Sequence, residues 1–348
     1  MEGRRLSADE GLELYQCRDL GFLGAMACCV KQKKSENEVY FNRNVHIEPT
    51  NVCVHHCRFC SYSCRAGEQN SWEKSIEEVV DEARRYQHSD ITEIHIVGGV
   101  HPDRNLHYYS SMLQAIRTVL PYVHIKALSA VELDYMFEKA CIEASEGLET
   151  LKLAGLQSIP GGGAEIFDEA IRNEICPEKT ASQRWLDIHC IAHRIGILSN
   201  ATMLYGHIER YEHRIEHMMR LRKLQDQTGG FNAFIPLKYK SGSNLMSSQL
   251  REATAIEDMK NYAVSRIFLD NIPHIKAYMP MIGMDMAQLS LAFGADDIDG
   301  PFEYTTKIYP KSRKPVITTT DITEMIRDAG YQPVERDSMY RKILSDTD

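Results

Sequence analysis

Short β-like runs alternate with helical stretches from about residue 45 to residue 298, and this alternation constrains the fold more than any other feature of the sequence. The runs are brief and apolar, whereas the stretches between them carry charged and apolar residues at helical spacing. Strands that alternate with helices in this way form parallel sheets, because each helix returns the chain to the same edge. About eight such runs are expected of a TIM-type (β/α)8 barrel.

Eight segments are expected to be strands, at 45–48, 94–97, 123–128, 157–160, 198–204, 231–236, 275–279 and 296–298. Helices are expected at 75–86, 107–120, 133–144, 148–156, 183–195, 209–226, 254–268 and 285–293. The strands at 157–160 and 296–298 are weak, so a six-stranded open barrel is an alternative. We expect one α/β domain with a helical lead-in at 1–40, the barrel at 41–300, and a C-terminal appendage at 301–348 with a helix at 321–328.

Composition narrows the class of protein. No apolar run approaches the ~20 residues that span a bilayer, and the charged N-terminus lacks the apolar core of a signal peptide. We therefore expect a cytoplasmic protein that does not bind a membrane. Ten cysteines in such a chain favour reduced thiols and a metal over a disulfide framework. The net charge of −9 gives no support for nucleic-acid binding, although a local pocket can still be basic enough for an anionic small substrate.

Cys53, Cys57 and Cys60 form a Cys-x3-Cys-x2-Cys triplet soon after the first expected strand. Thiolates at this density select zinc, copper(I) or an iron–sulfur cluster. Three thiolates bind three irons of a four-iron cubane and leave the fourth iron open, and an open coordination position is a reactive one. In barrels, active sites lie on loops at the C-terminal ends of the strands, so this loop is expected at the functional face.

Two other interpretations of the triplet are open. One is a zinc knuckle whose fourth ligand is Cys64, His55 or His56. Zinc sites usually show two paired groups of ligands, and here there is one compact triplet. The other is three unrelated cysteines, which this density disfavours. If a cluster is present, Cys64 is expected to be a free thiol.

The triplet, with the aromatic Phe59 just before the third cysteine, resembles that of the radical S-adenosylmethionine (SAM) enzymes. The resemblance implies a 4Fe-4S cluster on Cys53, Cys57 and Cys60, with SAM on the open iron. It also implies an electron donor such as flavodoxin or ferredoxin. Reductive cleavage of SAM releases a 5′-deoxyadenosyl radical, which a closed barrel keeps from water.

Further segments resemble the radical SAM enzymes of futalosine-pathway menaquinone synthesis and of deazaflavin synthesis. Segments 50–53, 160–166 and 206–209 are similar to the whole group, and 199–207, 230–237, 269–278 and 294–300 are similar to the aminofutalosine (aminodeoxyfutalosine) synthases. This resemblance implies a small carboxylate substrate, 3-[(1-carboxyvinyl)oxy]benzoate, to whose enol-ether double bond the radical adds. The implied products are 6-amino-6-deoxyfutalosine, methionine and bicarbonate or carbon dioxide.

Two kinds of alternative function remain. The cyclic dehypoxanthinyl futalosine synthases and the deazaflavin-cofactor synthases share the cysteine triplet and differ in the substrate pocket. A non-catalytic zinc or cluster-binding scaffold is the alternative of another class.

Four residues near the triplet or at strand ends are candidates for binding SAM. Gly98 and Gly99 end the second expected strand, where the missing Cβ lets a ligand approach the backbone. Tyr62 follows the triplet and is a candidate contact of the adenine. Glu132 follows the third strand, either as a ligand of the ribose hydroxyls or as a glutamate favoured by the dipole of a helix start.

Gly161, Gly162 and Gly163, with Glu165, form a second glycine-rich segment. Successive glycines before a helix can present backbone N–H groups to an anion. The segment is therefore expected to bind a carboxylate of the substrate or of the cofactor.

Polar residues on later strands are candidates for the catalytic site. Asn200 and Thr202 alternate on one strand, so both are expected to face the lumen, where polar groups are costly unless they bind something. His207, just past this strand, is expected to be a proton donor or a carboxylate ligand, with a structural histidine as the alternative. His274 and Lys276 repeat the alternation, and either is a candidate carboxylate ligand.

Overall fold

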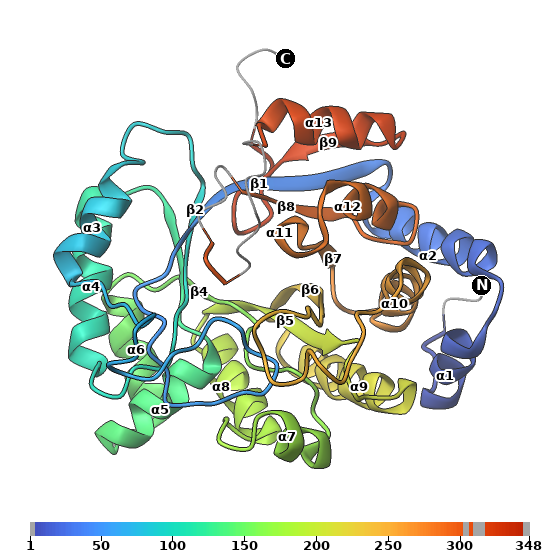
Figure 1. Cartoon of the computed structure of the whole chain (residues 1–348). Helices are drawn as coiled ribbons and strands as arrows, with labels where there is room; N and C mark the ends of the chain where they lie inside the picture. Colours follow the sequence, from blue (N-terminus) through green and yellow to red (C-terminus); the bar gives the residue numbers. More distant parts are fainter. Residues whose placement is uncertain (1–3, 302–305, 309–316, 344–348) are drawn as a thin grey trace.

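Eight parallel strands close into a barrel in the computed structural model, which describes residues 4–301, 306–308 and 317–343 (Figure 1). Each strand pairs with the next in the chain, and the first strand also pairs with the eighth, which closes the ring. The eight-stranded prediction is therefore confirmed, and the six-stranded alternative is wrong. The strands are β1 (Glu38–Ile47), β2 (Glu93–Ile96), β3 (His124–Ala127), β4 (Ser158–Ile159), β5 (Leu198–Tyr205), β6 (Phe231–Lys238), β7 (His274–Ala277) and β8 (Asp297–Pro301).

Helices surround the barrel and cover its outer face (Figure 1). Their starts follow local capping signals. Thr254, for example, accepts a hydrogen bond from the Glu257 N–H, so that α10 begins where the sequence predicts. The helices between strands are α3 (Ile76–Arg84), α4 (Leu106–Val119), α5 (Ala130–Ala140), α6 (Ala144–Leu153), α7 (Glu169–Ile175), α8 (Ser182–Arg194), α9 (Tyr211–Thr228), α10 (Ala255–Phe268), α11 (Met279–Ile282) and α12 (Met284–Leu291).

Some boundaries differ from those expected. Strand β1 begins at Glu38 rather than residue 45, because its first half pairs with distant strands that no local pattern reveals. Helix α5 begins at Ala130 rather than residue 133, because Ser129 caps it. The sequence did not predict α7, which is only seven residues long and too short for helical periodicity to be visible.

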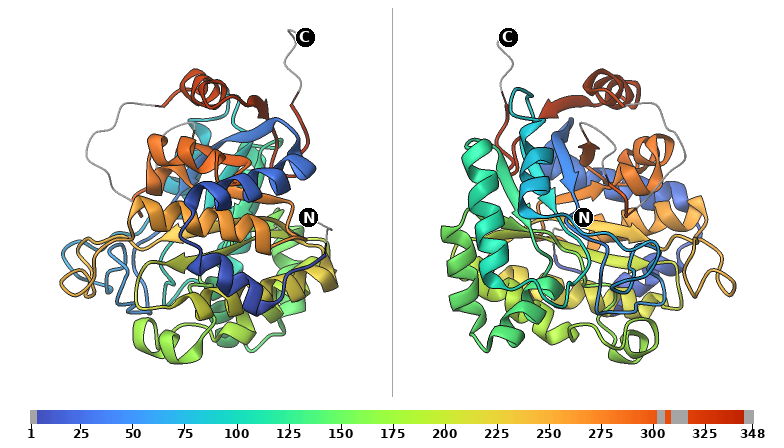
Figure 2. Two further views of the ribbon diagram at one scale, coloured as in Figure 1. Left: turned by 90° about the vertical axis from the view of Figure 1, so that its right-hand side faces the viewer. Right: turned by 60° about the vertical axis from the view of Figure 1, so that its left-hand side comes forward.

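The first two helices, α1 (Ala8–Gln16) and α2 (Leu20–Ser35), pack against the outside of the barrel beside α9 and α10 (Figure 2). The Tyr15 hydroxyl donates to the Asn261 side-chain oxygen at 2.5 Å. A Cβ on Gly11 would lie 2.6 Å from the Phe268 ring, so this close approach of α1 to α10 requires glycine.

The end of the described chain returns to β1. Helix α13 (Thr319–Asp328) is followed by β9 (Gln332–Glu335), a strand that the sequence did not predict (Figure 1). Tyr40 and Phe41 pair with both β8 and β9, so β9 lies on the edge of β1 opposite β8. On that edge, β2 pairs with β1 from Asn44 onward, and β9 pairs with the earlier residues of β1.

The loops after β1 and β6 lie on the same side of the molecule, at the C-terminal ends of the strands (Figure 2). They touch where the Asn244 side-chain amide donates to the Ser61 hydroxyl at 3.1 Å. This side is the functional face of such barrels. Within the described residues, no helix is both long and apolar enough to cross a membrane.

Candidate active site

The cysteine triplet lies in the loop that follows β1, and backbone hydrogen bonds define its shape. The Cys53 sulfur accepts N–H groups from Val100 at 3.3 Å and from His55 at 3.4 Å. The Cys53 N–H donates to the Cys64 carbonyl, and the Cys60 N–H donates to the Cys57 carbonyl, both at 3.0 Å. The loop is thus fixed both by its own backbone and by the loop after β2.

The chemistry of these thiols fits an iron–sulfur cluster. Burial raises the pKa of Cys57 to about 12, although the Lys179 ammonium opposes this, so a metal must displace the proton. Backbone N–H groups directed at sulfur, as at Cys53, are typical of cluster ligands. Among the described residues no three Cys, His, Asp or Glu side chains converge on the position of a single metal ion. A cubane does not require such convergence, because each thiolate binds a different iron.

Gly98 and Gly99 hold the loop after β2 directly against the cysteine loop. The Gly99 N–H donates to the Thr50 carbonyl at 2.9 Å. A Cβ on Gly99 would lie 2.2 Å from the Val52 carbonyl oxygen, and one on Gly98 would lie 2.8 Å from the Thr50 oxygen. Both positions therefore require glycine for packing. Gly98 also lines the main cavity, and Gly99 is not among its lining residues.

A cavity of about 600 Å³ extends from the cysteine loop into the barrel. Among the candidates predicted from the sequence, Cys60, Tyr62, Gly98, Glu132, Gly161, Gly162, Gly163, Glu165, Asn200 and Thr202 line it. The structure thus brings residues from five separate segments of the chain to one space. Cys53, Cys57 and His207 are not among the lining residues.

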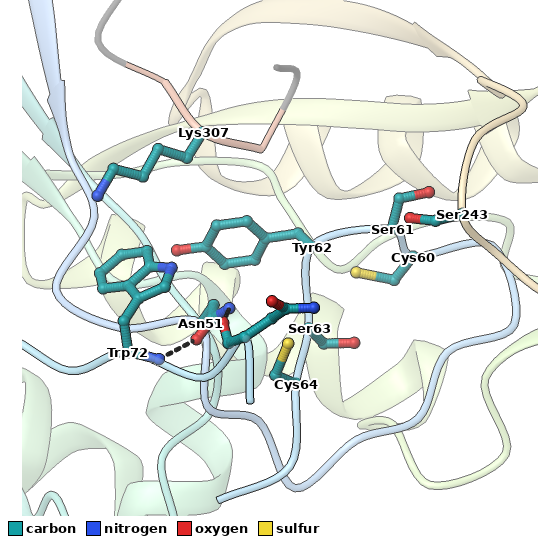
Figure 3. Close-up of a pocket in the computed structure, with 10 residues that line it drawn as sticks. Asn51, Cys60, Ser61, Tyr62, Ser63, Cys64, Trp72, Ser243 and Lys307 are labelled. Carbon is teal, nitrogen blue, oxygen red and sulfur yellow. Dashed lines mark hydrogen bonds between the residues drawn. The ribbon is translucent and has the colours of Figure 1, made fainter. Parts of the chain in front are cut away.

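Tyr62 lines both this cavity and a second space of about 360 Å³ beside the cysteine loop, here called the outer hollow (Figure 3). Its hydroxyl donates to the Thr50 carbonyl at 2.8 Å, and its ring meets Trp72 edge to face. Cys64 lines the outer hollow and not the main cavity. Figure 3 shows its sulfur on the same side of the loop as Asn51, which accepts the Trp72 N–H at 2.8 Å.

Glu132 lies in the first turn of α5, with its carboxylate at the wall of the cavity. The Ser129 N–H and hydroxyl both donate to this carboxylate at 2.7 Å. Burial raises the pKa of Glu132 to about 7, although the Ser129 hydrogen bonds and the Gly98 N–H oppose this shift. Glu132 is therefore both a capping residue and a titratable group beside Gly98.

The glycine-rich segment after β4 follows the wall of the cavity closely. A Cβ on Gly161 would lie 2.6 Å from the Asn200 carbonyl oxygen, and one on Gly163, with φ of +90°, would lie 2.3 Å from Val131. Gly162 has space for a Cβ. Glu165 forms an ion pair with Lys179 at 2.6 Å, so its carboxylate brings no uncompensated charge to the cavity.

Asn200 and Thr202 face the lumen from β5, as their alternation predicts, and the Thr202 hydroxyl donates to the Gly161 carbonyl at 2.5 Å. His207 lies outside the cavity instead. Its ring bonds to the Leu204 carbonyl at 3.1 Å, and its N–H donates to Glu209 at 2.8 Å. Burial lowers the pKa of His207, which favours the neutral ring.

His274 and Lys276 lie in different surroundings. His274 contacts Asp296 at 3.0 Å and stacks on Tyr340, away from the cavity. Lys276 lines the cavity. Arg336 binds Asp297 through two hydrogen bonds of 2.6 and 3.0 Å at the start of β8, and so closes the N-terminal end of the barrel.

The structure adds a polar wall of which the sequence reasoning had found only Lys276. It consists of Glu93 and His95 from β2, Lys126 from β3, Lys276 from β7 and Asp299 from β8, all of which line the cavity. The signal was present, because β2 reads Glu-Ile-His-Ile and β3 reads His-Ile-Lys-Ala, with polar residues at alternate positions. Such alternation on a strand covered by helices indicates a polar lumen.

Comparisons with known proteins identify the family of this chain. Residues 47–221 match the radical SAM superfamily, and residues 228–346 match the CofH/MqnC C-terminal region. The chain is 41% identical to the aminodeoxyfutalosine synthase of Thermus thermophilus, over 99% of this chain and 94% of that protein. It is 41% identical to that of Streptomyces coelicolor, over 97% and 90%.

More distant relatives extend the comparison. The cyclic dehypoxanthine futalosine synthase of Streptomyces coelicolor is 33% identical, over 98% of this chain and 86% of that protein. Among solved structures, methylornithine synthase superposes with a TM-score of 0.72 at 15% identity, over 95% of each chain. That likeness concerns the fold alone.

Proposed function

The chain belongs to the radical SAM superfamily and, within it, to the family of the aminodeoxyfutalosine synthases, and on that premise we propose how its residues act. The reaction joins the 5′-deoxyadenosyl group of SAM to 3-[(1-carboxyvinyl)oxy]benzoate. It yields 6-amino-6-deoxyfutalosine, methionine and bicarbonate or carbon dioxide. The observation that carries this function is the full-length identity to two aminodeoxyfutalosine synthases, in a chain whose cysteine loop opens on a barrel cavity.

Cys53, Cys57 and Cys60 would hold the 4Fe-4S cluster, and when bound the cluster supplies the electron that cleaves SAM. The N–H groups of Val100 and His55 stabilise the thiolate of Cys53. Cys64 remains a free thiol in this proposal, because it faces the outer hollow.

Tyr62, Gly98, Glu132 and the segment of Gly161, Gly162, Gly163 and Glu165 would bind SAM. They line the cavity beside Cys60. Gly98 offers backbone atoms without side-chain obstruction, and Glu132 offers a carboxylate to hydroxyl groups. Gly99 supports this site through its contact with the cysteine loop.

Asn200 and Thr202 would position the substrate from β5, because their polar groups face the lumen. His207 remains a predicted catalytic residue. Its bonds to Leu204 and Glu209, outside the cavity, support action through the end of β5 rather than contact with substrate.

Radical SAM enzymes act on small molecules and take an electron from an external reductant. We propose flavodoxin or ferredoxin as this reductant, and the cytoplasm as the location. Ten cysteines that are all free support a reducing compartment.

Anaerobic reconstitution tests the function directly. The reduced holoenzyme, with SAM and 3-[(1-carboxyvinyl)oxy]benzoate, is expected to form 6-amino-6-deoxyfutalosine, detected by mass spectrometry. Cys60→Ser is expected to lose the cluster absorbance and all product, whereas Cys64→Ser keeps both. If the cluster forms and SAM is cleaved without this product, the proposed reaction is wrong. The activities of the cyclic dehypoxanthinyl futalosine synthases and the deazaflavin-cofactor synthases would then be tested.

A further inference from the structure

Two strands on opposite sides of the barrel carry the same sequence, His-Ile-Lys-Ala. They are β3 (124–127) and β7 (274–277). In a ring of eight strands in chain order, the third and the seventh face each other. Lys126 and Lys276 occupy the same place in the two copies, and both line the cavity. The lumen therefore places two ammonium groups opposite each other.

Both lysines are buried, and each is paired with a carboxylate of the same wall. Lys126 donates to Glu93 at 2.7 Å, and Lys276 donates to Asp299 at 3.2 Å. Burial opposes the ionised form of Glu93, but Lys126 and Lys276 together hold its pKa well below the usual range. Both ammonium groups are thus within electrostatic reach of one carboxylate that lies between their strands.

Each ammonium group retains capacity for hydrogen bonds. An ammonium has three N–H donors. Within the part of the chain that the structure describes, Lys126 donates one hydrogen bond, to Glu93, and Lys276 donates one, to Asp299, with Asp297 a further 3.4 Å contact. Arg336 already binds Asp297 bidentately, so that carboxylate depends little on Lys276. Two lysines with unused donors on opposite sides of a buried cavity are suited to the two oxygens of a carboxylate.

Part of the remaining wall of the cavity is apolar. Leu204 from β5, Ile235 and Leu237 from β6, and Met281 from α11 line it. This apolar wall and the two lysines face one space. A molecule with a flat hydrocarbon body and a charged end is complementary to such a site.

We propose that Lys126 and Lys276 form a clamp for the benzoate carboxylate of the substrate, with its ring against Leu204, Ile235 and Leu237. This inference rests on the proposed function and assigns ligands that it left open. Lys276 reaches Asp297, near the closed N-terminal end, whereas Cys60 and Gly98 lie at the open end. The clamp therefore holds the far end of the substrate and directs the enol ether toward the SAM site.

The test compares two substrates with variants of the clamp. Holoenzyme with Lys276→Met is expected to show a KM for 3-[(1-carboxyvinyl)oxy]benzoate raised about 10- to 100-fold, the range for a lost charged hydrogen bond. The analogue with a carboxamide in place of the benzoate carboxylate is expected to bind the wild type and Lys276→Met equally poorly. The wild type therefore prefers the acid to the carboxamide, and Lys276→Met does not. The double variant Glu93→Gln/Lys126→Met tests the other lysine without leaving Glu93 unpaired.

Two further readouts keep the result interpretable. Lys31→Met removes a buried ammonium that packs on Tyr331, outside the cavity, and is expected to leave KM and the acid preference unchanged. Iron content and substrate-independent formation of 5′-deoxyadenosine are expected to be normal in every variant, which shows that folding and the SAM site are intact. The proposed clamp is wrong if its variants still prefer the acid and have a KM within twofold of the wild-type value. If the wild-type enzyme makes no aminodeoxyfutalosine, the proposed function is wrong. Titration calorimetry with 3-[(1-carboxyvinyl)oxy]benzoate then tests the clamp separately. Equal affinity of the wild type and the clamp variants for this acid would contradict the clamp.

Discussion

At the scale of single residues, the absence of a side chain is as decisive as its presence. Gly99 places its backbone so close to Val52 that a Cβ would lie 2.2 Å from a carbonyl oxygen. That oxygen belongs to the residue before Cys53. The position of the first cysteine is therefore set by a residue in another loop.

Gly99→Ala is expected to displace the cysteine loop and to lower the iron bound after reconstitution by at least about half, because backbone atoms cannot yield as a flexible side chain does. Iron content per chain and absorbance of the cluster measure this. Gly21→Ala, whose Cβ would meet its nearest neighbour at 3.4 Å, is the control and is expected to bind iron normally. Normal iron in Gly99→Ala would contradict the structural role.

Glu132 makes stability depend on pH in a defined direction. Burial raises its pKa to about 7, so the folded protein favours the protonated carboxyl. This contribution to stability is present below the pKa of the unfolded chain, near 4.3, and is lost as the pH rises through about 7.

Glu132→Gln is therefore expected to remove a decline in the free energy of unfolding of about 1.4 kcal/mol per pH unit between pH 5 and 7. Urea unfolding at several pH values measures the slope. The exposed Glu149→Gln is the control. Equal slopes in wild type and Glu132→Gln would show that the carboxyl is not buried in the folded state.

At the scale of elements, a fully buried ion pair joins the end of β9 to the barrel. Arg336 binds Asp297 bidentately, and the Tyr340 hydroxyl donates to the same carboxylate at 2.7 Å. Both charged groups are fully buried. Arg341 and Asp337 form a second pair nearby, but the Arg341 side chain is 79% exposed.

Arg336→Ala is expected to destabilise the fold by about 3 kcal/mol, because it leaves a buried carboxylate with weaker partners. Arg341→Ala is expected to cost less than about 1 kcal/mol, because solvent screens an exposed pair. Chemical denaturation of the two variants compares them directly. Similar losses would mean that the buried pair does not anchor the C-terminal segment.

The sequence predicted elements whose ends are determined by neighbouring residues, as at Thr254, which caps the start of α10. It failed where a distant partner decides, as for the first half of β1 and for β9. The same division holds in the site. Sequence spacing indicated Cys53, Cys57 and Cys60, whereas the position of Lys126 opposite Lys276 follows only from closure of the ring.

At the scale of the whole molecule, histidines with lowered pKa values are buried both beneath the helices and on the barrel strands. His193 is an example, with its ring nitrogens at 2.7 Å from the Thr228 and Ser199 hydroxyls. Burial lowers its pKa to about 4, and that of His124 also to about 4. Their contribution to stability is complete above about pH 6.5, the pKa of an unperturbed histidine, and is lost as the pH falls toward 4.

The protein is therefore expected to lose stability steeply between pH 6.5 and 4, by about 1.4 kcal/mol per pH unit for each such histidine. His193→Gln is expected to lower the free energy of unfolding at neutral pH. It is also expected to reduce the loss of this free energy between pH 6.5 and 4 by about 1.4 kcal/mol per pH unit. The exposed His88→Gln should leave the slope as in wild type. An unchanged slope in His193→Gln would contradict the buried neutral ring.

The pairing of β1 has a consequence for biosynthesis. Tyr40 pairs with Asp297 and Val334, so the first strand obtains most of its partners from the last strands to be translated. On the ribosome, the first half of β1 must wait without its strand partners while the rest of the barrel is made. Closure is then a slow step between distant parts of the chain. A nascent chain of this protein is therefore expected to expose this half of β1 until synthesis of the barrel is complete.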